Sequence, residues 1–592
     1  MYLSRVKIKN LRNFSAVDVK LAPNVVLLGE NRAGKSNFLF ALRLVLDASL
    51  TDRARQLRLS DIYDGCDLAA DPEVRVDLDF SDWGNDPALV ALLTDHRPAE
   101  DHAIARLSYV FRKKAEVEGP PKSEGDFEFK VFGGGDETRA VRPEVRRRIS
   151  LDILHALRDA EAELGTWRSS PLRPLLEDAL ASIEKDELGA VADKLNEASS
   201  KLTALAPVTA LEASIRKEIE GLSGAAHDIK AKLAFAPSDP LRVFRSIALF
   251  IDAGRRNLAD ASLGSANLAF LALKLAEFSW RRKKNERNYT VLCVEEPEAH
   301  LHPQLQRRIF NRLFGKNADP ARAMIITTHS PNIASVVSLK SVVLLRAGKE
   351  GTTAHALAHL PVQATDLEDL QRYLNTSRAD IFFSRGVIFV EGDAEEALLP
   401  AFALSMGHDL DDLGITVVNV GGVNFSPYVK LAAALQIPFS VITDWDPIAG
   451  KTPLGIKRAL DINDAIRVVS GLAPISPDNR AKAEAWEAGK FRAELAKKEI
   501  YLNDTTLEIA VANTSGLLNP LVEILEAEQF GSIRRGRLER WKAGEPVDGE
   551  QLLAMIAYIG KGRLSGRLLD KIAGIAPPQY IADAIKSVIE RA

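Results

Sequence analysis

The sequence predicts an α/β protein of several domains, in which an N-terminal domain with a helical insertion, here called the head, precedes a second, open α/β domain. Three observations predict this arrangement. A phosphate-binding pattern lies between an apolar strand and a helix at residues 29–36, helical periodicity dominates residues 151–235, and new apolar strands begin at Gly386. A chain of 592 residues is also too long for one hydrophobic core, so we expect two to four domains.

Alternating apolar residues predict the strands of the N-terminal part. They lie around residues 6–8, 17–21, 74–80, 107–111 and 127–132, and a short apolar strand covers 24–28. A helix is expected from about Ser36. The first part of the head, residues 1–150, therefore combines a mostly antiparallel sheet with one strand–loop–helix unit.

Residues 151–235 are predicted to be helical. Apolar residues spaced three and four apart form a short heptad seam, made of Leu188, Val191, Leu195, Ala198, Leu202 and Leu205. Pro207 interrupts the seam, and a second stripe follows at Leu211, Ile215 and Ile219. A helical hairpin packed on its own domain and an arm that pairs with a second subunit explain this pattern equally well.

Strand patterns return after the insertion and then change again. Strands at 289–294 and 323–327, with a helix between them, predict the second part of the head at residues 236–375. Apolar strands at 386–390, 415–420 and 438–443 predict a separate domain at residues 385–592.

The composition is that of an ordinary globular protein, with 46% hydrophobic and 27% charged residues. No apolar run approaches the length of a membrane span, and residues 1–10 lack the apolar core of a signal peptide. Cys66 and Cys293 are too few for a disulfide framework and form no CxxC motif. We expect a cytoplasmic protein with no membrane partner.

The net charge of −4 argues against a protein that binds polyanions over its whole surface. A local basic face would still be sufficient to hold DNA phosphates. Candidates are the basic clusters at 142–148, 281–284 and 534–540, for which a solvated helix face is the simpler interpretation.

Residues 29–36, Gly-Glu-Asn-Arg-Ala-Gly-Lys-Ser, match the pattern GxxxxGK[ST] in full. Backbone N–H groups of such a loop, at the start of a helix, wrap around phosphate oxygens, and we expect Asn31 and Gly34 to contribute to this cradle. Lys35 would meet the β- and γ-phosphates, and Ser36 would bind Mg²⁺. The sequence therefore predicts that ATP binds here with Mg²⁺.

Two further strands end in residues suited to a nucleotide. The strand at 289–294 delivers Glu295, which would support the Mg²⁺, and Glu296, which would orient a hydrolytic water. The strand at 323–327 leads to His329, which is placed to sense the γ-phosphate.

The phosphate loop, residues 295–303 and residues 327–331 resemble the ABC-type ATPase heads of the SMC, Rad50, RecF and OLD families, which carry a helical insertion. Such heads sandwich ATP between two copies and use a signature loop from the opposite copy. The resemblance implies that Ser262 and Gly264 belong to this loop, although their sequence departs from the usual LSGGQ. That departure weakens the case for hydrolysis more than the case for binding. Gln56 is a candidate for the Q-loop glutamine.

Acidic residues follow two strands of the second domain. Glu391 ends the strand at 386–390, Glu395 lies one helical turn later, and Asp444 and Asp446 follow the strand at 438–443. The carboxyl ends of strands form the ligand edge of an open α/β sheet, and an extended backbone would point Asp444 and Asp446 to the same side. Oxygen ligands suit Mg²⁺ or Mn²⁺, and two such ions can promote phosphodiester hydrolysis.

This pattern resembles the Rossmann-like Toprim domain of topoisomerases, DnaG-type primases and OLD nucleases. An ABC-type head followed by a Toprim domain is the arrangement of the OLD family, and the resemblance covers nearly the whole chain. It is closest to the class that accompanies a UvrD-like helicase, as in Gabija anti-phage systems. It implies that Glu391 and Asp444 are catalytic, that Lys561 lies beside the scissile phosphate, and that the metal ligands are Glu391, Glu395, Asp444, Asp446 and Glu508.

The leading hypothesis is therefore an ATP-regulated, metal-dependent DNA endonuclease or nickase that acts in anti-phage defence as a homodimer or tetramer, with a UvrD-like helicase as a possible partner. An alternative is a RecF- or SMC-like repair scaffold that binds DNA and ATP without cutting, but the complete carboxylate set argues against it. A topoisomerase would need a DNA-gate domain, and a primase usually has a zinc module, which two cysteines cannot supply.

Overall fold

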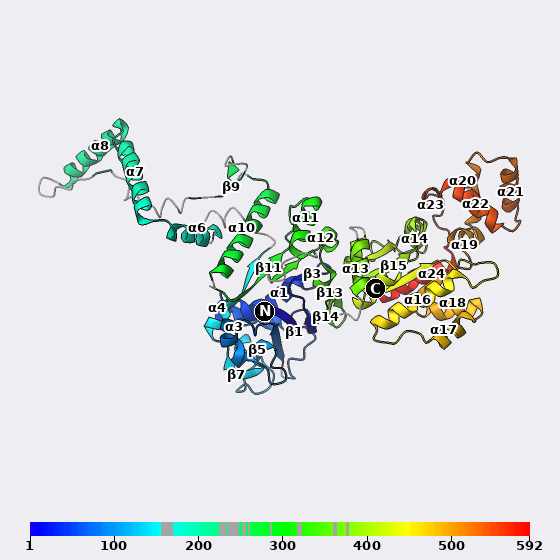
Figure 1. The fold of residues 1–592 in the computed structure, drawn as a ribbon, viewed down its shortest axis with the longest axis horizontal. Coiled ribbons are helices and arrows are strands. Elements are labelled where there is room, and N and C mark those ends of the chain that lie inside the picture. The colour runs from blue at the N-terminus through cyan, green and yellow to red at the C-terminus, as the bar shows by residue number, and fades with distance from the viewer. Residues whose placement is uncertain are drawn as a thin grey trace. The chain divides into compact units, whose positions relative to one another are not determined.

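The structure is a computed structural model that describes residues 1–70, 72–155, 170–223, 232–233, 247, 249–251, 256–257, 261–284, 287–315, 323–358, 364–374 and 378–592 (Figure 1). The chain forms two compact units. One contains Met1–Ala156, Tyr289–Glu298 and His302–Ala592, and the other contains Leu157–Asn288 and Ala299–Leu301. The expected domain limits at residues 235, 236 and 375 lie outside the described residues.

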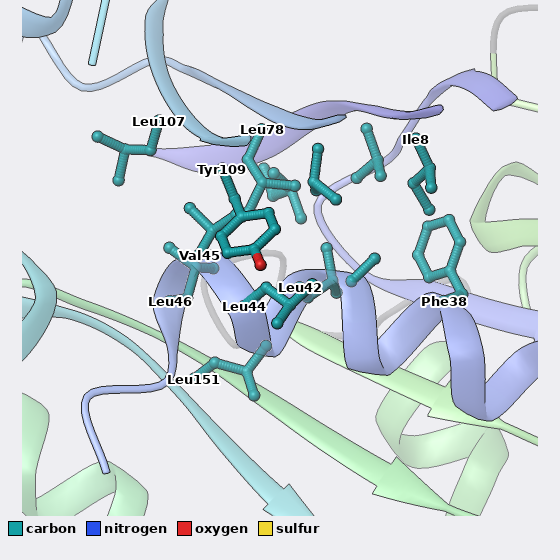
Figure 2. Close-up of a cluster of buried hydrophobic side chains, with 14 of the residues drawn as sticks. Ile8, Phe38, Leu42, Leu44, Val45, Leu46, Leu78, Leu107, Tyr109 and Leu151 are labelled. Atoms are coloured by element: carbon teal, nitrogen blue, oxygen red, sulfur yellow. The ribbon is translucent and has the colours of Figure 1, made fainter. Parts of the chain in front are cut away.

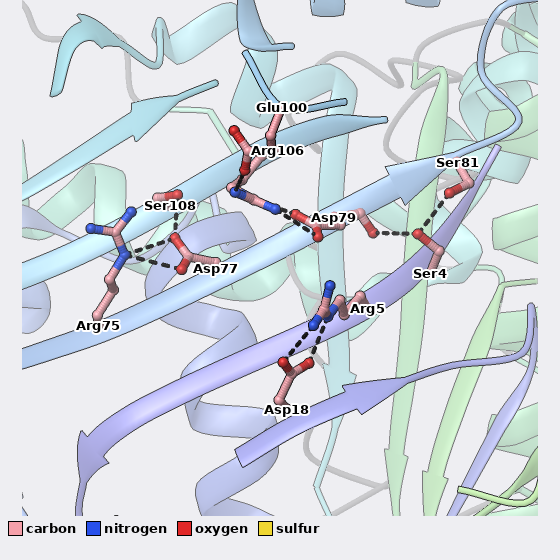
Figure 3. Close-up of polar contacts among 10 residues, drawn as sticks. All are labelled: Ser4, Arg5, Asp18, Arg75, Asp77, Asp79, Ser81, Glu100, Arg106 and Ser108. Atoms are coloured by element: carbon pink, nitrogen blue, oxygen red, sulfur yellow. Dashed lines mark hydrogen bonds and ion pairs between the residues drawn. The ribbon is translucent and has the colours of Figure 1, made fainter. Parts of the chain in front are cut away.

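The N-terminal strands form the predicted antiparallel sheet, with the order β2-β1-β4-β5-β6-β7. Its members are β1 (Tyr2–Leu11), β2 (Phe14–Lys20), β4 (Glu73–Ser81), β5 (Ala105–Lys113), β6 (Phe127–Gly133) and β7 (Asp136–Ala140). Residues on one face of β4, such as Val76 and Leu78, are fully buried. The alternate residues Asp77 and Asp79 are also buried, and they accept hydrogen bonds from Ser108 and Arg106 of β5 (Figure 3). These cross-strand pairs fix the register of the sheet.

A second, mostly parallel sheet has the order β14-β13-β3-β12-β11-β8. Its strands are β3 (Val25–Leu28), β8 (Ile149–Leu154), β11 (Tyr289–Glu295), β12 (Met324–Thr327), β13 (Val342–Gly348) and β14 (Gly351–Ala356). Three were not predicted: β8, which continues past residue 150 into the stretch expected to be helical, and the hairpin formed by β13 and β14. The parallel pairing brings the ends of β3, β8, β11 and β12 to one edge.

Helix α1 (Lys35–Leu46) lies between these two sheets (Figure 2). Phe38, Leu42 and Val45 are fully buried in one cluster with Leu78 and Leu107 of the antiparallel sheet. Because α1 is buried along most of its length, its first turn, which carries the phosphate loop, is held firmly between two sheets.

The remaining helices of the head are short. They are α2 (Asp52–Arg55), α3 (Pro87–Leu93), α4 (Pro143–Arg148), α11 (Pro303–Phe314), α12 (Pro331–Ala334) and α13 (Ala364–Tyr373). Single 3₁₀ turns occur at Leu59–Asp61, Thr94–His96, Glu124–Asp126, Leu339–Ser341 and Arg378–Phe383.

The described residues of the second compact unit are mainly helical, including those of residues 170–223, where helices were expected. The unit contains α6 (Leu172–Ala181), α7 (Lys185–Thr203), α8 (Ala206–Ser223), α10 (Leu263–Lys283) and the two-residue strands β9 (Phe250–Ile251) and β10 (Arg256–Asn257). Pro207 occupies the first turn of α8, where its missing N–H costs little. The heptad seam is open to solvent, with Val191 and Leu202 exposed by 46% and 52%. The described residues therefore do not cover it.

The C-terminal domain is built on a parallel sheet with the order β16-β15-β17-β18. Its strands are β15 (Gly386–Val390), β16 (Ile415–Asn419), β17 (Phe439–Thr443) and β18 (Ile500–Leu502). The three-residue β18 is too short to have been predicted. Both faces of β15 are covered, because Ile388 and Val390 join the cluster that includes Val588 of the last helix, while the ring of Phe389 packs near that of Tyr428.

Helices complete this domain, and some of them pack against the sheet while others pack mainly on one another. They are α14 (Asp393–Ser405), α15 (Ser426–Ala434), α16 (Leu454–Val469), α17 (Pro477–Glu484), α18 (Ala488–Ala496), α19 (Leu507–Asn513), α20 (Leu518–Glu526), α21 (Ser532–Lys542), α22 (Gly549–Ile559), α23 (Lys561–Leu569) and α24 (Gln579–Arg591). Among the described residues, no helix combines the length and the apolar character that a bilayer span requires.

Candidate nucleotide and metal sites

The phosphate loop joins β3 to α1 and depends on two glycines. Gly29 has a φ of +150° and Gly34 a φ of +95°, a region that L side chains rarely adopt. A Cβ atom at Gly34 would lie 2.2 Å from Nδ2 of Asn13, and one at Gly29 would lie 2.5 Å from the carbonyl oxygen of Leu345. Neighbouring atoms thus hold this loop in the close turn that brings backbone N–H groups toward a phosphate.

Lys35 is buried and folds back onto its own loop. Its Nζ donates to the carbonyl oxygens of Gly29 at 2.9 Å and Glu30 at 3.0 Å, and it lies 3.3 Å from Nδ1 of His329. Burial lowers the pKa of Lys35 to about 8, although Glu296 and other nearby carboxylates oppose this shift. A bound phosphate would give this ammonium group a negatively charged partner in direct contact. The predicted partners Asn31 and Ser36 are exposed on the same loop.

The ends of β11 and β12 bring the predicted acidic and histidine residues together. Nε2 of His329 lies 3.5 Å from Oε1 of Glu296, which has a φ of +42°. Glu298 fixes the residues that follow β12, since its Oε1 accepts hydrogen bonds from Thr328 Oγ1 at 2.7 Å and from the backbone N of His329 at 2.9 Å. Burial raises the pKa of Glu298 and, together with Lys35, lowers the pKa of His329.

The sequence did not indicate the role of His155, which follows β8. Because β8 pairs in parallel with β11, His155 reaches the end of the neighbouring strand, and its Nδ1 lies 2.8 Å from Oε2 of Glu295. Gln56 stays a candidate for the Q-loop glutamine. Its amide donates to the carbonyl oxygens of Glu124 and Phe127 and so ties α2 to the loop that precedes β6.

Ser262 and Gly264, the predicted signature residues, stand at the start of α10 in the second compact unit. The Ser262 hydroxyl caps the helix by accepting from the backbone N of Ser265 at 3.3 Å. A Cβ atom at Gly264 would lie 2.5 Å from the carbonyl oxygen of His300, so only glycine allows this close approach. The helix begins at Leu263, between these two residues.

In the C-terminal domain, Glu391 joins the ends of β15 and β17. Its Oε1 accepts hydrogen bonds from the backbone N of Asp444 at 3.0 Å and from the hydroxyl of Thr443. Oδ1 of Asp444 in turn accepts from Asn503 Nδ2 at 2.5 Å and from the backbone N of Leu507 at 3.1 Å. Asn503, which follows β18, is a site residue that sequence reasoning missed.

The buried Glu395 and the half-buried Asp444 lie close to other carboxylates. Burial is the main cause that raises the pKa of Glu395 to about 8, and Asp444 and Glu391 contribute to the shift. Burial also raises the pKa of Asp444 to about 7, with Glu391 as the next cause. Like charges that raise one another's pKa values mark a place where a cation would be stabilised.

Glu508 and Lys561 are brought together, as the resemblance implied. Nζ of Lys561, at the start of α23, lies 2.7 Å from Oε1 of Glu508 on α19, which is 5% exposed. Burial would lower the pKa of Lys561, but the contact with Glu508 and the nearby carboxylates raise it above its usual value.

Asp446 is held by a residue that no motif indicated. Arg458 of α16 donates from Nη1 to Oε1 of Glu391 at 2.5 Å and from Nη2 to Oδ2 of Asp446 at 2.7 Å. The argument that an extended backbone points Asp444 and Asp446 to one side is wrong, because Asp446 has a φ of +48°.

The donor set fits a hard divalent cation, since it consists of carboxylate oxygens whose charges are coupled. Within the described ranges, however, no three carboxylate, imidazole or thiolate groups already stand close enough to hold a metal ion. Glu391 and Asp446 contact Arg458 instead, and Glu508 contacts Lys561. A metal ion would therefore have to draw these side chains together.

Two family models match the chain. One, described as "Overcoming lysogenization defect protein-like, TOPRIM domain", matches residues 382–446, which include Glu391, Asp444 and Asp446. The other, described as "AAA domain, putative AbiEii toxin, Type IV TA system", matches residues 25–335, more than half of the chain. The phosphate loop thus falls in the second match, and the acids that follow β15 and β17 fall in the first.

Relatives are similar over nearly the whole length. An OLD nuclease of Thermus scotoductus is 25% identical over 89% of this chain and 96% of that protein. The endonuclease GajA of Bacillus cereus VD045 is 22% identical over 86% of this chain and 89% of that protein. A solved C-terminal region of the Burkholderia pseudomallei OLD protein is 33% identical over 36% of this chain and 100% of that chain, with a TM-score of 0.32. The chain belongs to the OLD family, which joins an ATPase domain to a Toprim domain.

Proposed function

We propose that this protein is a DNA endonuclease or nickase whose Toprim domain requires a divalent metal ion and whose head binds ATP as a regulator. The observation that carries this proposal is the carboxylate cluster of the buried Glu395 and Glu508 and the half-buried Glu391 and Asp444, with Lys561 beside it. The relatives named OLD nuclease and endonuclease GajA support the same reaction class.

The Toprim residues would hold Mg²⁺ or Mn²⁺, and the carboxylate count is sufficient for two ions: Glu391, Glu395, Asp444, Asp446 and Glu508. Such ions supply Lewis acidity for phosphodiester hydrolysis. The chain itself positions the ligands, since Asn503 and the backbone N of Leu507 fix Oδ1 of Asp444, and the backbone N of Asp444 fixes Oε1 of Glu391. Mutual repulsion among these carboxylates makes the site selective for cations.

Lys561 would hold the scissile phosphate. Its side chain is 61% exposed while its ammonium group contacts the buried Glu508, so it can turn toward a bound strand without losing its charge. A lysine ammonium at this position neutralises a phosphate oxygen during the cut.

The head would bind ATP through Asn31, Gly34, Lys35 and Ser36, with Glu295 supporting the Mg²⁺. Glu296 and His329, whose side chains lie 3.5 Å apart, would orient the water and sense the γ-phosphate. Ser262 and Gly264 would contact the nucleotide of a second copy. In this proposal ATP sets the arrangement of the subunits and supplies no energy to the cut.

The proposal is tested by incubating supercoiled plasmid DNA with the protein, with and without Mn²⁺, Mg²⁺ and ATP. We expect nicked or linear DNA only when a divalent ion is present, and none from Asp444→Ala. Lys35→Ala should keep the cutting chemistry but lose its response to ATP. Asp412→Asn, an exposed acid in the same domain, is the matched control and should cut like wild type. Absence of cutting by wild type, with ATP binding intact, would favour a DNA-binding scaffold.

The exposed apolar stripes of α7 and α8 support an assembly of two or four copies. Leu202 and Leu211 are exposed by 52% and 55%, and such apolar side chains on a helical hairpin are typical of a coiled-coil contact. Light scattering should show a dimer or tetramer for wild type and a smaller species for Leu202→Glu.

A UvrD-like helicase partner and a role in anti-phage defence complete the proposal, and the family resemblance alone supports them.

A further inference from the structure

Arg458 stands at the centre of the carboxylate cluster. It belongs to α16, and its side chain is only 10% exposed. Nη1 donates to Glu391 Oε1 at 2.5 Å, to Thr443 Oγ1 at 2.7 Å and to the carbonyl oxygen of Asp444 at 3.2 Å. Nη2 donates to Asp446 Oδ2 at 2.7 Å. One guanidinium group therefore connects the acidic residues that follow two neighbouring strands.

The charge of Arg458 is permanent, because a guanidinium group does not lose its proton in a protein. A buried positive charge needs partners of opposite charge, and breaking such a pair by removing one member is strongly destabilising. The fork of two nitrogens contacts Glu391 and Asp446 at once, which a lysine at the same position could not do. In the metal-free protein, Arg458 supplies the positive charge that these two carboxylates require.

The positively charged side chains of Arg458 and Lys561 contact some acids of the cluster and not others. Arg458 contacts Glu391 and Asp446, and Lys561 contacts Glu508. Asp444 is held by neutral donors, the Asn503 amide and the backbone N of Leu507. A divalent ion that binds Asp444 meets a carboxylate fixed by neutral groups, whereas one that binds Glu391 and Asp446 competes with a guanidinium group.

We propose that Arg458 is a built-in competitor of the metal: it stabilises the metal-free Toprim domain and must release Glu391 and Asp446 before a second divalent ion binds. The protein thus binds two divalent ions in unequal steps, a stronger one on the Asp444 side and a weaker one opposed by Arg458. This inference rests on the proposed metal-dependent function of the same site. It gives Arg458 the part of a positioning residue, because it acts on the ligands and not on DNA.

The test uses the full-length protein without nucleotide and the variants Arg458→Gln and Arg458→Lys. Arg480→Gln is the matched control, since Arg480 of α17 also bridges carboxylates outside the cluster: Asp461 at 2.5 Å, Asp464 at 3.2 Å and Glu484 at 3.6 Å. Mn²⁺ binding is followed by calorimetry and by the electron paramagnetic resonance signal of free Mn²⁺. Thermal unfolding is measured in EDTA and in saturating Mn²⁺.

In EDTA we expect Arg458→Gln to unfold at a temperature lower by about 5–10 °C, and Mn²⁺ to stabilise it more than it stabilises wild type. The weaker Mn²⁺ site should become about tenfold tighter in Arg458→Gln. Arg458→Lys should lie between wild type and Arg458→Gln, and Arg480→Gln should bind Mn²⁺ as wild type does. If Arg458→Gln does not fold in EDTA, the Mn²⁺ affinity of Arg458→Lys is compared with that of wild type, and tighter binding by Arg458→Lys supports the inference.

Weaker or unchanged Mn²⁺ binding in both Arg458 variants would overturn the inference, because Arg458 would then support the ligands. Plasmid cutting separates this failure from that of the proposed function. If wild type cuts DNA with Mn²⁺ while the Arg458 variants bind it no more tightly, only the inference fails. If the variants bind Mn²⁺ more tightly but no form cuts DNA, only the nuclease proposal fails. If no form binds Mn²⁺, both are wrong.

Discussion

The phosphate loop and the carboxylate cluster prepare for charged ligands in opposite ways. The loop is one continuous run of eight residues, and its shape comes from the backbone, with glycines at φ +150° and +95° packed against neighbouring atoms. The cluster gathers side chains from residues 391 to 561, which are fixed by partners on several helices and strands. In the head, Lys35 contacts carbonyl oxygens and His329, and in the Toprim domain Glu395 and Asp444 lie close to other carboxylates.

This difference predicts which kind of substitution should inactivate each site. A change of backbone shape should destroy the loop, whereas the cluster should tolerate changes of shape and respond to changes of charge. Four predictions, in order of decreasing effect, test whether the two sites fail in these separate ways.

Asp444→Asn should reduce DNA cutting on the order of 10³-fold, because it removes a charge from the cluster while keeping the size of the side chain. Plasmid nicking measures this loss. ATP binding by the head, followed with a fluorescent analogue, should stay at the wild-type level. A parallel loss of ATP binding would mean that the two sites do not fail separately.

Gly34→Ala should abolish ATP binding and destabilise the head by about 1–3 kcal/mol, because the added Cβ atom meets Asn13 and the backbone has a positive φ. Nucleotide titration and urea unfolding measure the two effects. Gly119→Ala separates the causes, since Gly119 has a φ of +77° but nothing within 4 Å of the added atom. Equal effects of the two changes would show that crowding by Asn13 is unimportant.

The metal-free protein should lose stability as the pH rises from about 4 to about 8. Burial raises the pKa of Glu395 to about 8 and that of Asp444 to about 7, so the folded chain keeps protons that the unfolded chain has released. Each group then contributes up to about 1.4 kcal/mol per pH unit within its window. Urea unfolding in EDTA at several pH values measures this slope. Glu395→Gln should flatten it, and an unchanged slope in that variant would contradict the assignment.

His155→Ala should weaken binding of ATP with Mg²⁺ by a factor of about 2–5, because the imidazole is 59% exposed and such contacts contribute little. Nucleotide titration at fixed Mg²⁺ measures the change. His102→Ala, an exposed histidine outside the site, should have no effect. Unchanged binding in His155→Ala would show that the contact with Glu295 has no role in nucleotide binding.

The head was the more predictable region. The pattern at residues 29–36 places Lys35 and Ser36 without any knowledge of distant contacts, because a loop that uses its own backbone carries its geometry in consecutive residues. Glu296 and His329 were also placed, since both follow apolar strands. His155 was missed because its strand is an edge strand within a stretch expected to be helical, and only the pairing of β8 with β11 brings it to Glu295.

The Toprim site shows what a sequence leaves open. Strand ends identified Glu391, Asp444 and Asp446, but Asn503 and Arg458 carry no motif and reach the cluster from β18 and α16 through tertiary packing. The extended backbone assumed for Asp446 was also wrong, since its φ is +48°.

By itself, the sequence determined that this chain has a phosphate loop and, at separate strand ends, a set of carboxylates, because local patterns fix strands, helices and the loop between them. Only the tertiary structure decided which charges face one another. Ion pairs such as Arg458 with Glu391, or Lys561 with Glu508, join residues far apart in the chain, and their existence depends on how helices pack around the sheet.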